Sequence, residues 1–451
     1  MTSLNISDYG AVGDGCRINT EEIQRAINEC AGHGGGTVLI PPGVFVTGTL
    51  WLGDHVHLHL CAGAVLKGSP DPADYNRADA FPQNKGTARH ASGGHLLIAL
   101  NATGVSLTGE GVIDGNEAAF RGPLIPQQDR PARFGPSSWR PAQMVYFCEC
   151  TDLVLRNVTL RNAPHWHLFL HGSSGARIDS LSIHCDRRSL NGDGIDIDCS
   201  RNVVVSNCLI HVSDDAITVR ADGRHLVKTD PVCENVVISN SVLSSRCNAI
   251  RIGVGDGTIR NISFSNMVIS DTAGAGINIT GNYRADMSGT EIENLRFDGF
   301  SMEAETAFHV TTGFRATKAI RNLLFSNIHA TSSSASYLGG CPEGDLLEEI
   351  TFSNVHMEVR GGRENRNDAA SPLAHYETAP TYFRRALGMP YLFYIEHARE
   401  IRFEGLSLRW KEIDGLWLHA IAARSCHHLH AEGIRTGTPP PTFEEAVGSL
   451  D

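Results

Sequence analysis

The sequence predicts an all-β solenoid, in which short strands coil and stack along one axis. Three observations support this fold class: a recurring strand–turn–strand pattern, the lack of helical segments between its copies, and a high glycine content. The 46 glycines among 451 residues suit a fold with many turns. A chain of this length can form one large domain or two to three average ones. Because no linker is visible, we predict a single domain over residues 1–451.

The recurring pattern is a short apolar run, then Asn, Gly or another small residue, then a second short apolar run. Each copy is too short for a helix and is interrupted at its centre, so we expect a strand, a turn and a strand. Neighbouring copies begin about 25 to 33 residues apart, with one longer gap before the last. Repeats of this length indicate stacked coils, and the spaced leucines of leucine-rich repeats are absent. Clear copies are Val203–Ile210, Val236–Leu243, Ile262–Ile269, Leu323–His329 and Ile350–His356.

The two ends of the repeat array differ from its centre. Residues 20–31 form the one clear amphipathic pattern near the start, with Thr20 as the expected N-cap and two glutamates in the first turn. We expect this helix to cap the open edge of the first coil, within an N-terminal cap region of about residues 1–50. Residues 361–385 are polar and have no regular pattern, which predicts an inserted loop.

Bulk properties narrow the possible partners and locations. The net charge of −12 leaves no basic surplus for a nucleic acid. The first residues carry no secretion signal and no apolar run is long enough to span a membrane, so we expect a cytoplasmic protein with no membrane contact. In that setting the twelve cysteines are expected to be mostly buried free thiols rather than disulfides. The examples within strand-like runs are Cys185, Cys199, Cys208, Cys233 and Cys247.

Three aspartates stand out in the centre of the chain. Asp193 lies in Asn-Gly-Asp-Gly-Ile-Asp, and Asp214 and Asp215 follow one coil later in Ser-Asp-Asp. If one coil takes about 22 residues here, the carboxylates lie about one strand spacing apart, or about 4.8 Å. No cation is obvious nearby, so at least one pKa is expected to rise, as acid/base catalysis requires. Both Asp214 and Asp215 can join such a site only at a strand end or bulge.

Two other interpretations of these aspartates remain open from spacing alone. Asp, Asn and Gly are common at solenoid turns, so the cluster fits a solvated corner. Clustered carboxylates on β-helices also suit a calcium ion.

Several motifs together resemble glycoside hydrolase family 28, the polygalacturonases. Asn191-Gly-Asp193 and Ser213-Asp-Asp215 resemble its N-x-D and D-D motifs, and Gly111–Gly115 resembles its G-x-I-D-G turn. Support from outside the acid cluster comes from three further segments, Asp8–Gly15, Arg140-Pro141 and Asn162–Trp166.

This resemblance implies a right-handed parallel β-helix that cleaves glycosidic bonds with inversion. It implies that Asp214 is the general acid, that Asp193 and Asp215 activate water, and that Asn191, two residues before Asp193 and expected on the same strand face, orients them. It implies no cofactor and no metal ion. A separation of about 6.5 to 9.5 Å between acid and base would leave room for the water.

Two motifs of the family are altered in this sequence. Asn248 stands where the family has the histidine of G-H-G, and Asn278 and Thr280 stand where it has R-I-K. Asn and Thr cannot replace the charges that grip a galacturonate carboxylate. We therefore expect a neutral sugar, a rhamnogalacturonan-type linkage, or a carboxylate held elsewhere. The candidate replacements are Arg251 and Arg220, with Arg246 a weaker one; the alternative for each is an exposed arginine on a solenoid face.

Trp166 and three alternating histidines are further candidates for a functional role. Trp166 lies in a segment that resembles a cleft wall, so we assign it to substrate binding, with a plain core aromatic as the alternative. His55, His57 and His59 alternate along one expected strand and favour a polar strand face, since three ligands in one extended strand do not converge on a metal.

The sequence therefore predicts a glycosidase of the polygalacturonase type, inverting and exo-acting, on pectin-derived or related oligosaccharides. Rival functions are a β-helix lyase or glycosyl transferase, and a non-catalytic carbohydrate-binding protein. The expected partner is an oligosaccharide substrate, and the oligomeric state is not predicted.

Overall fold

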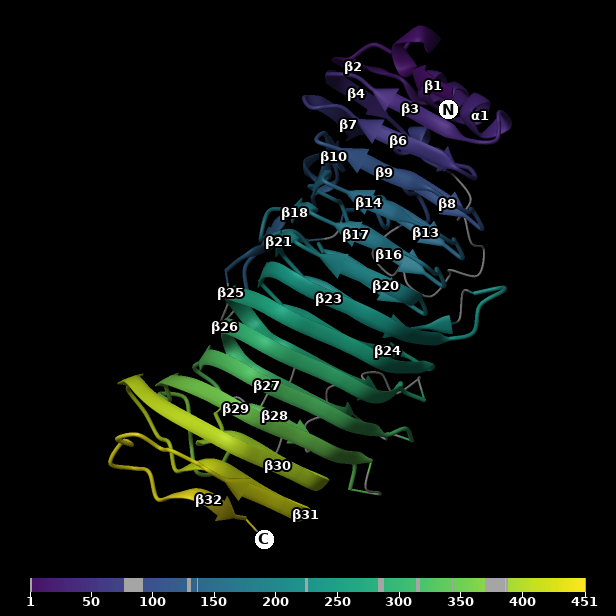
Figure 1. Cartoon of the computed structure of the whole chain (residues 1–451). Coiled ribbons are helices and arrows are strands. Elements are labelled where there is room, and N and C mark those ends of the chain that lie inside the picture. Colours follow the sequence, from purple (N-terminus) through teal and green to yellow (C-terminus); the bar gives the residue numbers. More distant parts are fainter. Residues whose placement is uncertain are drawn as a thin grey trace. The chain divides into compact units, whose positions relative to one another are not determined.

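The computed structural model describes residues 2–76, 92–127, 131–135, 137–223, 226–282, 288–313, 317–342, 344, 346–369, 386 and 388–450. The chain divides into two compact units. The N-terminal unit comprises residues 1–218 and 223–231, and the C-terminal unit comprises residues 219–222 and 232–451. Both are built mainly from parallel strands (Figure 1). The single domain over residues 1–451 stays a prediction.

In the N-terminal unit, coils contribute strands to three parallel stacks, so each strand pairs with one on the coil before it and one on the coil after it. The first stack contains β1 (Thr2–Asn5), β3 (Gly36–Ile40), β6 (Val56–Leu60), β9 (Ser106–Gly109), β14 (Val154–Arg156), β17 (Arg177–Asp179) and β20 (Arg201–Ser206). The second contains β2 (Asp14–Ile18), β4 (Gly43–Thr47), β7 (Ala64–Gly68), β10 (Val112–Asp114), β15 (Thr159–Arg161), β18 (Ser182–His184) and β21 (Leu209–Val212). The third contains β5 (Leu50–Leu52), β8 (Leu97–Leu100), β13 (Val145–Cys148), β16 (Leu168–His171) and β19 (Ile195–Asp198).

Other elements of this unit lie outside the stacks. They are the 3-10 helices η1 (Ile6–Tyr9), η2 (Pro72–Asp74) and η3 (Glu117–Phe120), and an antiparallel pair of β11 (Leu124–Ile125) and β12 (Arg133–Phe134).

The predicted N-terminal helix is present as α1 (Thr20–Gly32) and packs against β1, β3, β5 and β6. Its buried face carries Ile23, Ala26, Ile27 and Cys30. The predicted cap residue is wrong by one position. Asn19 occupies the N-cap, and Thr20 is the first helical residue, with Oγ1 accepting from the backbone N–H of Gly48 at 2.7 Å.

In the C-terminal unit the strands are longer because they continue around the corners of a coil. They are β22 (Ile217–Ala221, shared with the N-terminal unit), β23 (Val232–Ser245), β24 (Ile250–Gly255), β25 (Thr258–Asn282), β26 (Glu291–Gly313), β27 (Ile320–Ser332), β28 (Ser336–Gly339), β29 (Leu347–Gly361), β30 (Tyr391–Ile413), β31 (His419–Glu432) and β32 (Glu445–Ser449). Successive coils pair in parallel, for example Ile262 with Leu295 and Ile350 with Ile401.

The Asn directly before several copies of the sequence pattern lies at a corner of these coils. Asn261, Asn294 and Asn322 have φ values of 56°, 58° and 55°, the left-handed conformation that Asn tolerates better than most residues. Their amides also form a ladder, in which Asn294 Nδ2 donates to Asn261 Oδ1 at 3.2 Å and Asn322 Nδ2 donates to Asn294 Oδ1 at 2.6 Å. Each corner therefore bends the chain and bonds to the coil before it.

The core of the C-terminal unit is filled by the phenylalanine of the same pattern. Neighbouring rings are nearly parallel, with centroids 4.8 to 5.3 Å apart. All are buried. Such offset stacks add to the burial of apolar area. The stack contains Phe264, Phe297, Phe325, Phe352 and Phe403.

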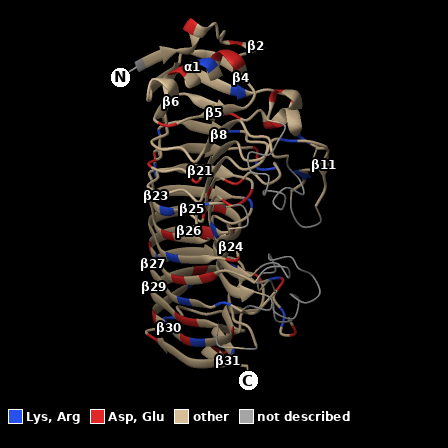
Figure 2. Cartoon of the chain, turned by 90° about the vertical axis from the view of Figure 1, so that its right-hand side faces the viewer, with Lys and Arg blue, Asp and Glu red and all other residues tan. Residues whose placement is uncertain are grey.

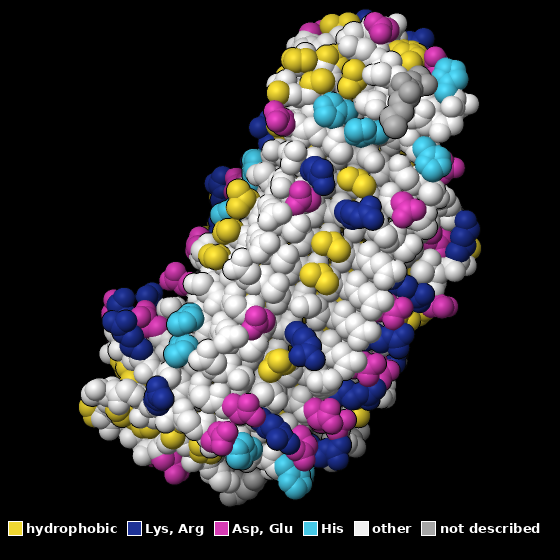
Figure 3. Space-filling view, in the orientation of Figure 1, with side chains coloured by type: hydrophobic (Ala, Val, Ile, Leu, Met, Phe, Trp, Pro, Cys, Tyr) yellow, Lys and Arg dark blue, Asp and Glu magenta, His cyan; other side chains and the backbone are white. Residues whose placement is uncertain are grey.

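The surface and the cysteines follow the expectations from composition. Figure 2 marks acidic and basic positions on the ribbon along the C-terminal unit. There, Arg260 forms an ion pair with Glu234, and Arg321 forms one with Glu293. The face in Figure 3 likewise mixes both charge signs. All twelve cysteines are free, and among the five named above Cys199, Cys208 and Cys233 are fully buried.

Two further expectations concern segments outside the coils. Across the part of the chain that the structure describes, no helix has the length and apolarity to cross a bilayer. The predicted insertion at 361–385 falls largely on residues 370–385, which lie outside the described residues; its first residues are a turn region after β29.

Candidate active site

The predicted aspartates lie in the N-terminal unit, where connections lead into the third stack. The backbone N–H groups of Gly194 and Ile195 donate to the oxygens of Asp215 and Ala216, both at 3.0 Å. These bonds place Asp193 and Asp215 at matching points of adjacent coils, as the spacing predicts. The two residues are 6% and 4% exposed, so their carboxyl groups are largely removed from water.

Asp214 lies in the connection between β21, which ends at Val212, and β22, which begins at Ile217. Strand alternation does not apply there, which agrees with the expectation of a strand end. Oδ1 of Asp214 accepts from the backbone N–H of Asp215 at 3.1 Å, and Oδ2 accepts from Nδ2 of Asn191 at 3.4 Å. Both contacts favour the ionised form of Asp214.

Asn191 reaches Asp214 by a route that differs from the expected one. It does not share a strand face with Asp193, because β19 begins only at Ile195 and Asn191 has a φ of 55°. The contact instead arises from a left-handed turn in the connection 185–194, here called the Asp193 loop. This turn directs the Asn191 amide toward Asp214 on the next coil.

The cluster contains a cation that sequence reasoning did not place there. Arg140 is 3% exposed, and its Nη2 donates to Oδ1 of Asn191 at 2.9 Å. Burial lowers the pKa of Arg140 to about 10, while Asp193, Glu117 and Asp214 act in the opposite direction. The guanidinium therefore stays charged at neutral pH. The expectation of a cluster without a cation is therefore wrong.

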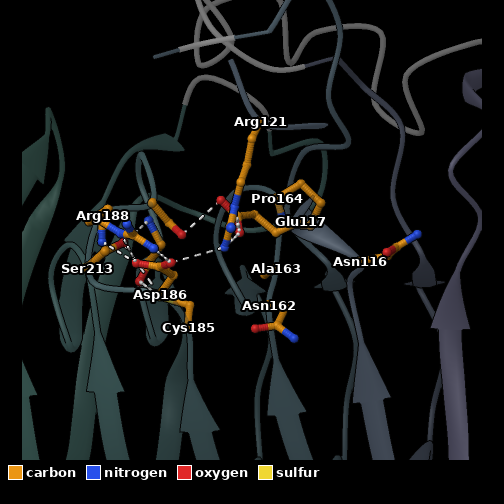
Figure 4. A network of polar contacts seen from close by, with 12 residues as sticks. Asn116, Glu117, Arg121, Asn162, Ala163, Pro164, Cys185, Asp186, Arg188 and Ser213 are labelled. Atoms are coloured by element: carbon orange, nitrogen blue, oxygen red, sulfur yellow. Dashed lines mark hydrogen bonds and ion pairs between the residues drawn. The ribbon is translucent and has the colours of Figure 1, made fainter. Parts of the chain in front are cut away.

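A second set of charges holds the start of the Asp193 loop (Figure 4). Ser189 Oγ donates to Oε1 of Glu117 at 2.9 Å, and Arg121 Nε donates to Oε2 of Glu117 at 2.6 Å. Glu117 is 4% exposed and therefore largely shielded from water. Protein groups donate to both of its carboxylate oxygens. The loop residue Ser189 is therefore tied to η3 by a charge-assisted hydrogen bond.

Asp186 and Arg188 add a local clamp within the same loop. Arg188 donates to Asp186 from its backbone N–H at 2.9 Å and from Nη2 at 2.7 Å, which lowers the pKa of Asp186 to about 2. The guanidinium groups of Arg121 and Arg188 lie 4.3 and 5.1 Å from the ring centre of Phe134. The loop is thus held by ion pairs and an aromatic ring rather than by strand pairing.

The end of the loop packs so closely that only glycine fits. A Cβ on Gly192 would lie 2.5 Å from Ser213 Oγ, and one on Gly194 would lie 2.3 Å from the backbone oxygen of Ala216. Ser213 Oγ also accepts from the Gly192 N–H at 3.2 Å. The two glycines of the Gly-Asp-Gly motif therefore allow one coil to approach the next.

The G-x-I-D-G segment contributes a structural ion pair. Asp114 accepts from Arg161 Nε at 2.8 Å and from the backbone N–H of Asn116 at 2.9 Å. A Cβ on Gly115 would lie 2.7 Å from the backbone oxygen of Asn162, so this glycine permits the close approach of the next coil. Figure 4 shows Asn116 and Asn162 in this region.

Trp166 packs into a hydrophobic cluster with Tyr146, Cys148 and Phe169, and only 9% of it is exposed. Its ring meets Phe169 edge to face, with centroids 5.4 Å apart. This environment fits the alternative of a core aromatic better than a substrate-facing ring. A role in substrate binding stays a prediction.

The altered family positions lie in the C-terminal unit and form a neutral row. Asn278 Nδ2 donates to Asn248 Oδ1 at 3.2 Å, and Thr280 Oγ1 donates to Asn278 Oδ1 at 2.7 Å. Asn248 also accepts from the backbone N–H of Ala275 at 3.3 Å. All three side chains are at least 97% buried. The amides therefore replace charged groups with a bonded neutral network.

The proposed replacement arginines lie in the same unit. Arg251, on β24, is 4% exposed and pairs in register with Asn278. It alternates with the buried Ile250 and Ile252, so it faces away from the core. Arg220, on the neighbouring strand β22, is 7% exposed. Neither is the exposed surface arginine of the alternative interpretation; the weaker candidate Arg246 is half-buried.

The outward row of Arg251 continues along successive coils. Asn278 pairs with His309, His309 with Tyr337, and Tyr337 with Tyr394. The hydroxyls of both tyrosines donate to Glu396, at 2.7 and 2.9 Å. His309, Tyr337 and Tyr394 are at most 1% exposed, and both tyrosines belong to a buried hydrophobic cluster, so this part of the row is structural.

One group in the N-terminal unit brings metal-ligand atoms together. His171 on β16, Asp198 at the end of β19 and Cys199 directly after it are buried and offer ligand atoms within 4.8 Å of one another. These residues are separate from the three predicted catalytic aspartates. On β6, the predicted polar strand face is present, since His57 and His59 both contact the Thr108 hydroxyl.

Arg140 and Glu117 are the residues that sequence reasoning left out of the site. The Arg140-Pro141 pair is one of the segments that resemble the family, so the sequence pointed to Arg140 as a candidate. The repeat spacing, however, did not predict its contact with Asn191. No such resemblance pointed to Glu117. It acts through a contact between residues 72 positions apart, which no repeat predicts.

Comparison with known proteins identifies a family whose model matches part of the chain. Residues 83–235 match the model of the glycosyl hydrolases family 28. This range contains Arg140, Asn191 and all three aspartates, whereas Arg251 and Asn278 lie beyond it.

The curated relatives are polygalacturonases. An exo-poly-alpha-D-galacturonosidase of Dickeya chrysanthemi is 29% identical over 314 residues, which cover 60% of this chain and 51% of that enzyme. A probable polygalacturonase of Vitis vinifera is 27% identical over 379 residues, which cover 79% of this chain and 74% of that protein. The chain thus spans about half the length of the first relative and about three quarters of the second.

Solved structures confirm the fold class. A family 28 exopolygalacturonase of Yersinia enterocolitica has a TM-score of 0.68 at 18% identity, covering 97% of this chain and 79% of that one. A hyperthermoactive exopolygalacturonase of Thermotoga maritima has a TM-score of 0.64 at 21% identity, covering 79% and 87%. The predicted right-handed parallel β-helix is therefore confirmed.

Proposed function

We propose that this chain, a polygalacturonase-like glycosidase of the family 28 type, hydrolyses glycosidic bonds of pectin-derived oligosaccharides at the aspartate cluster. The observation that supports this most directly is the pairing of Asp193 and Asp215 on adjacent coils, with Asp214 between Asp215 and the Asn191 amide. The half-buried Asp214 and the buried Asp193 and Asp215 can divide the acid and base roles of hydrolysis between them.

In the proposed mechanism, Asp214 protonates the leaving oxygen while Asp193 and Asp215 deprotonate the attacking water. Attack from the opposite face of the sugar inverts the anomeric centre. Before each turnover Asp214 must hold a proton, although its two hydrogen bonds favour the carboxylate. We infer that the negative charge of the neighbouring carboxylates and the exclusion of water by bound substrate supply the opposing effect.

The proposed substrate differs from plain polygalacturonate. The neutral row of Asn248, Asn278 and Thr280 has no charge to match a carboxylate. Arg251 and Arg220 are buried arginines that can hold one elsewhere, while a neutral sugar or a rhamnogalacturonan-type linkage would need neither. Exo action fits the names of the Dickeya, Yersinia and Thermotoga proteins. A cytoplasmic location, with imported oligosaccharides as substrate, stays part of the proposal.

The test is a screen of purified protein against oligogalacturonides, rhamnogalacturonan fragments and neutral α-linked oligosaccharides. We expect release of a terminal sugar whose first-formed anomer, followed by proton NMR, is inverted. A first product that retains the substrate's configuration would exclude the inverting mechanism. Release of internal fragments would exclude exo action.

The same screen separates the rival functions. A lyase gives an unsaturated product that absorbs in the ultraviolet and loses activity with a chelator. A transferase gives longer products when an acceptor sugar is added. A non-catalytic binding protein shows calorimetric binding without turnover.

A further inference from the structure

We propose that Arg140 is a positioning residue of the aspartate cluster, acting through Asn191 on Asp214. Its guanidinium fixes the Asn191 side chain so that the amide N–H, and not the amide oxygen, faces the carboxylate. This inference rests on the proposed function and adds to it the group that orients the general acid.

The orientation follows from donor and acceptor chemistry. A guanidinium only donates, so the atom of Asn191 that meets Arg140 Nη2 at 2.9 Å must be the amide oxygen. The remaining amide group, Nδ2, then lies toward Oδ2 of Asp214 at 3.4 Å. If the amide turned over, its oxygen would face the carboxylate oxygen, and two acceptors would repel. Arg140 therefore selects the one amide orientation that attracts Asp214.

Arg140 is suited to this role because it is itself fixed. Its Nη1 donates to the backbone oxygens of Pro164 at 2.8 Å and Leu190 at 2.7 Å. Pro164 lies just before β16 and Leu190 lies just before β19, and these two strands pair with each other. The guanidinium therefore links the segments that lead into both strands. Three hydrogen bonds from a planar group define its position, which a lysine ammonium cannot reproduce.

The charge of Arg140 has a separate effect. The acidic groups that act on it are Asp193, Glu117 and Asp214. A fixed positive charge near Asp193 favours the ionised form of this proposed base. Removal of the charge should therefore raise the pKa of the base and move the acidic limb of the pH–rate profile to higher pH.

The experiment compares Arg140→Lys and Arg140→Gln with the wild type. We expect kcat to fall about 10- to 100-fold in both, with KM changed less than about threefold, because misplacement acts on the transition state. Arg140→Gln should also shift the acidic limb upward, whereas Arg140→Lys keeps the charge and should not. Arg156→Gln is the matched control, since this arginine lies on β14 and is 59% exposed.

A double-mutant cycle with Asn191→Gly tests the route. Glycine accepts the φ of 55° at Asn191, so the variant removes the side chain without straining the backbone. If Arg140 acts through Asn191, the double variant Arg140→Lys/Asn191→Gly should have nearly the same kcat as Asn191→Gly alone. Additive losses in kcat would overturn the proposal.

Crystal structures of Arg140→Lys and Arg140→Gln separate this inference from the proposed function. We expect the Asn191–Asp214 contact to be lost or the amide to be turned over in both variants, even if no substrate is found. An unchanged Asn191 and Asp214 in both structures would overturn the positioning role. Absence of turnover by the wild type on every oligosaccharide would overturn the proposed function instead.

Discussion

Nδ1 of His167 lies 2.7 Å from the backbone oxygen of Asp193, and the backbone N–H of His167 donates to the same oxygen at 2.9 Å. A carbonyl oxygen only accepts, so Nδ1 carries the proton. The ring is completely buried, and burial lowers the pKa of His167 to about 4. A neutral imidazole thus anchors the residue that is proposed to activate water.

Acid should destabilise the protein through this histidine. The unfolded chain takes up a proton below about pH 6.5, whereas folded His167 stays neutral until about pH 4. The stability that His167 contributes is therefore complete above pH 6.5 and is lost progressively as the pH falls to 4, by up to about 3 kcal/mol. Burial also lowers the pKa of His95 to about 4, so this histidine adds a similar dependence of stability on pH. Urea unfolding between pH 4 and 7 measures this, and His167→Asn should reduce the slope. An unchanged slope would contradict the assignment.

Each of the three aspartates proposed to be catalytic should be required for turnover. We expect Asp193→Asn, Asp214→Asn and Asp215→Asn to lower kcat by about 10²- to 10⁴-fold with little change in fold. Asp230→Asn is the matched control, because this carboxylate in the same unit is 85% exposed. Initial rates at saturating substrate, with circular dichroism to verify folding, provide the measurement. Full activity of Asp193→Asn or Asp214→Asn would show that the site is elsewhere.

Gly194 should tolerate no side chain. Its added Cβ would lie 2.3 Å from the backbone oxygen of Ala216, so Gly194→Ala must push apart the coils that carry Asp193 and Asp215. We expect a loss of about 1 to 3 kcal/mol in the free energy of unfolding, with a large loss of kcat. Gly32→Ala is the control, since it meets no atom within 4 Å in α1 and should stabilise by about 0.5 to 1 kcal/mol. Equal thermal midpoints for the two variants would contradict this account.

Arg251 should distinguish charged from neutral substrates. If it holds a uronate carboxylate, Arg251→Gln should raise KM for oligosaccharides with a free carboxylate about 10-fold or more, because it removes a charge-assisted hydrogen bond. KM for the methyl-esterified counterpart should change little. Steady-state kinetics on the two matched substrates provide the measurement, and an equal rise for both would show that Arg251 has only a structural role.

The sequence predicted most of the fold because the coil corners are encoded locally. A residue such as Asn294 serves as a corner through its own φ preference and bonds to the same residue one coil away. Phe297 repeats with the same period and stacks on its neighbours. Local preference and repeat spacing therefore pointed to the same structure.

The surroundings of the aspartates could not be predicted in the same way. Asp193 and Asp215 follow the coil spacing, so their pairing was visible in the sequence. Arg140 and Glu117 come from segments outside the repeat, and only the folded chain brings them to the Asp193 loop. For Trp166, the position in a family-like motif suggested a ring in contact with substrate. The motif could not show that the ring is buried in a hydrophobic cluster.

The coil corners also bear on how such a protein can diversify. Strand β29 ends at Gly361 and β30 begins at Tyr391, yet Ile350 still pairs with Ile401 and Phe352 with Phe403. A connection between coils can thus lengthen while the ladder on either side keeps its register. Evolution can insert, shorten or exchange such connections one at a time, and each change leaves the remaining coils as a ready scaffold for the next.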